Sequence, residues 1–191
     1  CHSIGFLVDA DQAMAWRGPM VVGAFNQILN DTQWGDLDYL VVDMPPGTGD
    51  IQLSLAQSVP VTGAVIVTTP QDVALLDAKR GIEMFRKVGI PILGVVENMG
   101  LHICDECGHV DHIFGEGGAV RIAKDYAVDV LGSLPLNKAI RENSDGGVPI
   151  VAAVAYGKVA EIYRNIAVLV ASTVQDLNSS LSTPNISIVD D

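Results

Sequence analysis

The stretch LDYLVVDMPPGTGD, residues 37–50, joins a mainly apolar segment to a turn rich in glycine and proline. The apolar part, residues 37–42, has no consistently polar face. This pattern is typical of a strand in a parallel sheet that is buried on both sides. Asp43 therefore falls at the carboxyl end of a predicted strand, the edge at which open α/β sheets bind ligands.

The turn that follows Asp43 has the chemistry of a phosphate and magnesium site. A carboxylate at this position can hold Mg²⁺ directly or through water. Gly47 and Gly49 lack a Cβ, so that backbone N–H groups can approach a phosphate closely. The alternative is a plain loop between a strand and a helix, in which Asp43 caps the helix. The pattern favours the nucleotide interpretation over this alternative.

The rest of the chain alternates between strand-like and helix-like segments. Strands are predicted at residues 4–8, 39–43, 64–68, 92–97 and 130–134. Helices are predicted to begin near Pro19 and near Asp50, and to cover residues 72–88, 117–127 and 151–173. This alternation predicts an α/β fold with a mainly parallel sheet and helices on both faces. Residues 1–175 are expected to form one domain, and the polar residues 176–191 a disordered tail.

Composition restricts the function. The chain has 191 residues and a net charge of −12, which disfavours extended contact with nucleic acid or anionic lipid. There is neither a signal-peptide pattern nor an apolar run of membrane-spanning length, and we therefore expect a soluble, cytoplasmic protein. Of the three cysteines, Cys1 has no partner nearby in the sequence.

The other two cysteines form a Cys-x-x-Cys, Cys104 and Cys107, which in a reducing compartment indicates metal binding or redox chemistry. His102, His109 and His112 surround the pair. On these residues alone a zinc site is the preferred interpretation, because a Cys₂His₂ site needs no second chain. A thioredoxin-like redox pair is disfavoured because the motif does not open a helix.

One expected element is absent from these residues. Phosphate-binding proteins of this architecture carry a glycine-rich loop that ends in Gly-Lys-Ser or Gly-Lys-Thr. The glycine-rich segments 115–118 and 145–147 contain no lysine and do not match it.

Several segments, in order along residues 3 to about 172, closely resemble the Mrp/ApbC family of iron-sulfur cluster carriers, which are P-loop ATPases related to MinD. The matching segments are WRGPM (16–20), DYLVVDMPPGTGD (38–50), PVTGA (60–64), TTPQD (68–72) and VENM (96–99). The resemblance implies a P-loop NTPase fold of the SIMIBI type. It also implies that the phosphate-binding loop and the first strand precede residue 1, so that residues 1–191 alone are expected to have little or no ATP hydrolysis activity.

The resemblance further assigns nucleotide roles to residues of this chain. Asp43 would orient Mg²⁺ and its waters, while Gly47 and Thr48 would sense the γ-phosphate of ATP. Asn98 matches the asparagine that bonds the adenine base, although an Asx turn after a strand is an equally good explanation without the family. Pro135 and Leu136 fall where a family loop flanks the base.

Cys104 and Cys107 match the family's Cys-x-x-Cys, half of the ligand shell of a [4Fe-4S] cluster. A four-cysteine shell then requires two protomers, which implies a homodimer. Asp105 stands where the family often has proline. The implied function is an ATP-dependent carrier that passes its cluster to apo iron-sulfur proteins, with segment 102–112 as an insertion in the NTPase domain. The alternatives are a MinD-like or ParA-like positioning ATPase and a zinc-stabilised interaction module.

Overall fold

The computed structural model describes residues 1–6, 18–45, 47–104 and 106–180 of the chain. Its centre is a parallel three-stranded sheet of β1 (Ala64–Thr68), β2 (Ile92–Glu97) and β5 (Val130–Ser133), in the order β1-β2-β5. β1 and β5 each pair with β2 in parallel, and Val96 of β2 lies opposite Val67 and Gly132. The predicted parallel sheet is confirmed.

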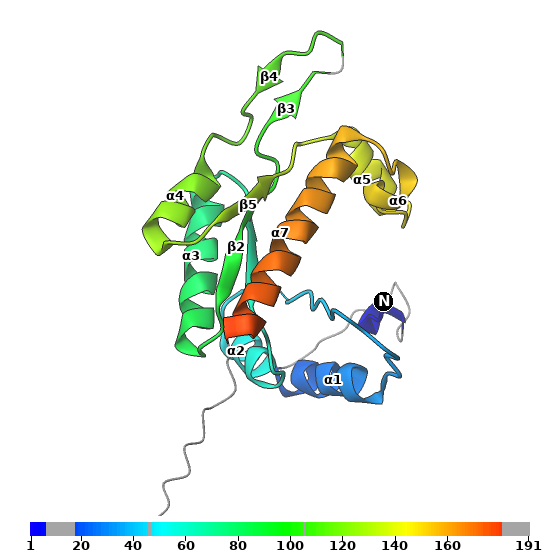
Figure 1. Ribbon diagram of the computed structural model, residues 1–191, viewed down its shortest axis with the longest axis vertical. Helices are drawn as coiled ribbons and strands as arrows, with labels where there is room; N and C mark the ends of the chain where they lie inside the picture. Colours follow the sequence, from blue (N-terminus) through cyan, green and yellow to red (C-terminus); the bar gives the residue numbers. More distant parts are fainter. Residues whose placement is uncertain (7–17, 46, 105, 181–191) are drawn as a thin grey trace, which may run out of the picture.

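Helices cover both faces of this sheet, which gives three layers (Figure 1). α3 (Asp72–Lys87) and α4 (Gly118–Tyr126) pack on one face, and α7 (Lys158–Ser180) packs on the other. On the first face, the fully buried Ile82 and Ile122 contact Val95. Consecutive parallel strands need crossover connections, and α3 and α4 serve as these connections.

The remaining elements lie around the three layers. They are a 3₁₀ helix η1 (Ile4–Phe6), α1 (Gly18–Asp31), α2 (Asp50–Gln57), β3 (His102–Ile103), β4 (Val110–Asp111), α5 (Lys138–Asp145) and α6 (Ile150–Ala153). β3 and β4 form an antiparallel hairpin between β2 and α4. Figure 1 shows this hairpin projecting from one end of the layers, while α1 and α2 lie at the opposite end.

The strand predicted at residues 39–43 is wrong. In the structure these residues pair with no other strand among the described residues. Their apolar side chains are exposed, and Val41 is 91% accessible to solvent. An apolar sequence supplies strand propensity, but a strand also needs a neighbour to which its N–H and C=O groups can bond, and none lies beside this segment.

The strand predicted at residues 4–8 is also wrong where the structure describes it, because Ile4–Phe6 is a 3₁₀ helix. Ser3 explains the difference: its hydroxyl accepts a hydrogen bond from Gly5 N at 3.1 Å, and its carbonyl accepts one from Phe6 N at 3.1 Å. Local bonds of this kind compete with strand pairing. Residues 7 and 8, like Trp16 and Arg17 of the first family segment, lie outside the described residues.

The helix predicted at residues 151–173 is two helices. α6 ends at Ala153 and α7 begins at Lys158, with a turn closed by a 3.1 Å bond from Gly157 N to Val154 O. α7 continues to Ser180 and so includes residues 176–180, which were expected to belong to the polar tail; residues 181–191 lie outside the described part. Extending an existing helix costs far less than starting one, which lets a polar segment continue α7.

Candidate functional site

The carboxyl ends of the three parallel strands meet at one edge of the sheet, and Asn98 lies there directly after β2. Its backbone N–H donates to Thr68 O of β1 at 2.7 Å, which fixes the residue beside the neighbouring strand end. Its side-chain Oδ1 accepts a bond from Met99 N at 3.0 Å. This contact is to the next residue, whereas an Asx turn bonds the backbone two residues on. The Nδ2 group is the donor that Asn98 can offer to a base.

The loop that contains Pro135 and Leu136 lies against the segment after Asn98. Gly100 N donates to Leu134 O at 3.0 Å, and Leu136 N donates to Leu101 O at 2.7 Å. The structure thus brings together the residues predicted to contact adenine, which lie far apart in the sequence. Pro135 and Leu136 are half-buried, as Asn98 is.

Glu97, the last residue of β2, was not predicted to have a role. Its carboxyl group is buried, with only 8% of the residue exposed. Oε2 accepts a bond from Ala119 N at 2.9 Å, at the start of α4, and Oε1 accepts one from Ser133 Oγ at 3.4 Å. The sequence signal that could have identified Glu97 was an acidic residue at the end of an otherwise apolar strand.

Cys104 and Cys107 lie at the turn of the β3–β4 hairpin. Cys104 N donates to His109 O at 2.9 Å, and Gly108 N donates back to Cys104 O at 2.9 Å, so the turn is closed by main-chain bonds. Cys104 is half-buried and Cys107 is exposed. The hairpin therefore places the Cys-x-x-Cys at a point that projects from the layers of the fold (Figure 1). Asp105, between the two cysteines, lies outside the described residues.

Two of the nearby histidines bond to backbone carbonyls. His102 Nδ1 lies 3.1 Å from Leu136 O, and His112 Nδ1 lies 3.0 Å from Gly100 O. Within the described ranges, no three His, Cys, Asp or Glu side chains gather in a way that could hold a metal ion. Cys104 and Cys107 are thus the candidate metal ligands that this part of the chain offers, and they are a pair.

Asp43, Gly47 and Thr48 are exposed in the irregular segment between α1 and α2. Gly47 has φ = 101°, a left-handed conformation that favours glycine. Gly49 N donates to Oε1 of the buried Gln52 at 3.0 Å, which fixes the start of α2. α1 and α2, which flank this segment, lie at the end of the layers opposite the hairpin (Figure 1), and among the described residues no hydrogen bond links Asp43, Gly47 or Thr48 to Asn98.

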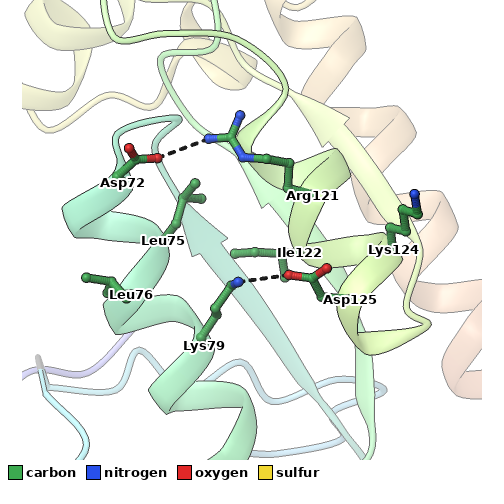
Figure 2. Close-up of a pocket in the computed structure, with 8 residues that line it drawn as sticks. All are labelled: Asp72, Leu75, Leu76, Lys79, Arg121, Ile122, Lys124 and Asp125. Carbon is green, nitrogen blue, oxygen red and sulfur yellow. Dashed lines mark hydrogen bonds and ion pairs between the residues drawn. The ribbon is translucent and has the colours of Figure 1, made fainter.

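A cavity of about 470 Å³ lies between α3 and α4, away from all the predicted site residues. Figure 2 shows its lining: Asp72, Leu75, Leu76, Lys79, Arg121, Ile122, Lys124 and Asp125. Arg121 pairs with Asp72 at 3.3 Å and Lys79 with Asp125 at 2.8 Å. The hydrogen bond between Lys79 and Asp125 raises the pKa of Lys79 and lowers that of Asp125. These pairs join the two helices.

Among the described residues, no helix has both the length and the apolar character needed to cross a membrane.

Known proteins resemble this chain along most of its length. Residues 1–171 match the family described as NUBPL iron-transfer P-loop NTPases, of the ParA group. An iron-sulfur cluster carrier protein from Pseudomonas fragi is 61% identical over 87% of this chain and 58% of its own length. The iron-sulfur cluster transfer protein NUBPL of Mus musculus is 51% identical over 94% of this chain and 56% of its own length. The chain thus spans a little over half the length of these relatives.

Solved structures share the fold. A nucleotide-binding protein from Archaeoglobus fulgidus in complex with ADP is 36% identical, with a TM-score of 0.60 over 67% of this chain and 53% of that one. The cell division ATPase MinD of Pyrococcus furiosus is 22% identical, with a TM-score of 0.59 over 82% of this chain and 59% of that one. At that identity the likeness to MinD shows the fold alone.

Proposed function

The chain belongs to the family of NUBPL iron-transfer P-loop NTPases, and on this premise we propose that it forms part of an ATP-dependent iron-sulfur cluster carrier. Its cargo is a [4Fe-4S] cluster held by Cys104 and Cys107, and its recipients are apo iron-sulfur proteins. The names of the curated relatives support the carrier function. A reducing compartment such as the cytoplasm suits a thiolate pair, and we propose that localisation.

The position of the Cys-x-x-Cys carries this proposal. Its two cysteines occupy the turn of a projecting hairpin, and within the described residues no third metal-ligating side chain joins them. Two thiolates complete half of a four-cysteine shell, so a second copy of the chain must supply the other half. A projecting turn leaves the space that two copies need to share a cluster and to present it to a recipient.

The nucleotide part of the proposal rests on Asn98, Pro135 and Leu136. These residues fit an adenine base, because they converge at the carboxyl edge of the sheet and the Asn98 amide offers an N–H donor. The ADP complex of the Archaeoglobus fulgidus protein supports nucleotide binding. ATP, with Mg²⁺, would supply the free energy that changes the arrangement of the two protomers. Asp43, Gly47 and Thr48 remain the residues that we propose face the metal and the γ-phosphate.

Anaerobic reconstitution of the full-length protein with iron and sulfide tests the cargo assignment. We expect broad visible absorption and a dimer in the wild type, and loss of both the absorption and the bound iron in Cys104→Ser and in Cys107→Ser. Cys1→Ser is the matched control, since Cys1 is exposed and lies far from the hairpin in the sequence. Its iron content should equal that of the wild type.

The same samples separate the carrier from a zinc-stabilised module. Stoichiometric zinc without iron in protein purified without oxygen would favour the module, and unchanged iron and sulfide in the two hairpin variants would refute the proposed cluster ligands. A Cys₂His₂ zinc site would use two of the three nearby histidines, His102, His109 and His112. At least one of His102 and His112 would therefore have to act as a ligand.

A further inference from the structure

The base of the cysteine hairpin is bonded to both loops of the proposed adenine site. On one side, Leu136 is held twice by consecutive residues: its N–H donates to Leu101 O at 2.7 Å, and its carbonyl lies 3.1 Å from His102 Nδ1. On the other side, the carbonyl of Gly100 lies 3.0 Å from His112 Nδ1. Both histidines flank the base of the hairpin, while the cysteines occupy its turn.

The chemistry of these contacts fixes which atom donates. A carbonyl oxygen can only accept, so Nδ1 of each histidine must carry the proton and donate it. An imidazole ring has few torsional degrees of freedom, and its Nδ1–H therefore holds the hairpin at a defined angle to the loop that it bonds. His102 is half-buried, which shields its contact with Leu136 from water.

The two bonded carbonyls belong to the loops expected to move when a base binds. Leu136 follows Pro135, and Gly100 lies two residues after Asn98. Gly100 N also donates to Leu134 O at 3.0 Å, so the two loops are bonded to each other as well as to the hairpin. A displacement of either loop must change the position of the hairpin or break a bond to a histidine.

We infer that His102 and His112 are positioning residues that couple occupancy of the adenine site to the geometry of the Cys104–Cys107 pair. This inference rests on the proposed function, because it assumes that the strand-end loops bind a nucleotide and that the hairpin binds the cluster. It adds a route for regulation: nucleotide binding is transmitted through two imidazole–carbonyl bonds to the thiolates.

The test measures the reactivity of Cys107 in the apo form of the full-length protein. Cys107 is exposed, so its alkylation by iodoacetamide can be followed by peptide mass spectrometry with and without Mg-ADP. ADP affinity is measured in parallel by calorimetry. In the wild type we expect ADP to change the alkylation rate at least about fivefold, the lower end of typical allosteric coupling.

Four variants test the role of the imidazole bonds. His102→Phe keeps the ring volume but removes the donor, and we expect it to lose most of the response to ADP. His102→Asn retains an N–H near the position of Nδ1 and should restore the response. His109→Phe is the matched control, because His109 is exposed on the same hairpin and the described residues give its ring no partner. The double variant His102→Phe, His112→Phe should show no response.

The outcomes distinguish this inference from the proposed function. Failure of the wild type to bind ADP would remove the nucleotide part of the proposed function and the coupling with it. ADP binding without any change at Cys107, or an equal change in the wild type and the double variant, would overturn the coupling and leave the carrier proposal standing. Amide exchange in β3 and β4 shows whether His102→Phe keeps the hairpin folded.

Discussion

Gly118 shows how tightly single residues fit at the edge of the sheet that carries the site. A Cβ placed on Gly118 would lie 2.7 Å from Pro70 Cα, 3.1 Å from Leu75 Cδ2 and 3.3 Å from Glu97 Oε2. The absent side chain lets the first turn of α4 approach the loop after β1. It also lets Ala119 N reach the buried carboxyl group of Glu97.

Gly118→Ala should therefore lower the free energy of unfolding by about 1–3 kcal/mol, the usual cost of overpacking. The matched control is Gly81→Ala in α3, where an added Cβ would meet no atom within 4 Å. That change should raise the free energy of unfolding by up to about 1 kcal/mol, because alanine favours a helix more than glycine does. Urea unfolding followed by circular dichroism measures both, and equal effects of the two changes would contradict the packing argument.

At the scale of elements, the sequence predicted the strands whose residues form a continuous apolar run. β1 and β2 have bounds that match the predicted strands, because each has a continuous apolar sequence; β2 is buried along nearly all of its length, while Val67 of β1 is exposed. The hairpin was missed, because strands of two residues each are too short to show a period. α5 was also missed; its start is fixed by Asn137 Oδ1, which accepts a bond from Ala139 N at 2.8 Å.

The same limit applies to the candidate site. The cysteine pair was identified from local sequence and Asn98 from the family resemblance, and the structure places each in a definite contact. The bond between His102 and Leu136 joins residues 34 positions apart. No local pattern predicts a contact of that kind, since it depends on how β2 and β5 pair.

α7 packs on its face of the sheet through an apolar stripe that includes Ile166. This residue packs on the cluster of Val96, Leu131 and Leu134, and a Cβ on Gly132 would lie 2.7 Å from its Cγ1.

Ile166→Ala should lower the free energy of unfolding by about 2 kcal/mol, the low end of the usual range, since Ile166 is partly buried and the change removes methyl groups that pack on the core. Val168→Ala on the same helix is the control, because Val168 is 66% exposed and should contribute little. Thermal unfolding of the two variants in parallel provides the measurement. A similar fall in the free energy of unfolding of both variants would mean that α7 stabilises the fold through helix propensity rather than through packing.

At the scale of the whole molecule, the described residues leave considerable apolar surface uncovered. Tyr39, Leu40 and Val41 are exposed in the segment before α2, and Val67 is 61% exposed on β1. β1 is also an edge of the sheet in the described part of the chain. Exposed apolar strands and open edges favour association between copies, which a net charge of −12 opposes only in part.

We therefore expect residues 1–191, purified by themselves, to self-associate as their concentration rises. Val41→Lys should increase the fraction of monomer, because it places a charge in the exposed apolar segment. Val120→Lys is the control, since Val120 is also exposed, on α4, but lies apart from that segment. Sedimentation velocity over a concentration series measures the monomer fraction. A monodisperse wild-type chain at every concentration would rule out this expectation.

The carboxyl group of Glu97 holds the two ends of the excursion that contains the hairpin. Residues 98–118 leave the sheet at Glu97 and return at Ala119, whose N–H bonds that same side chain. The number of residues between Glu97 and Ala119 is therefore not set by the distance between the strands. The loop-closure entropy of a longer segment adds only about 0.6 kcal/mol per doubling of its length. The far end of this segment can therefore change in length while Glu97 and Ala119 hold its two ends together at the sheet.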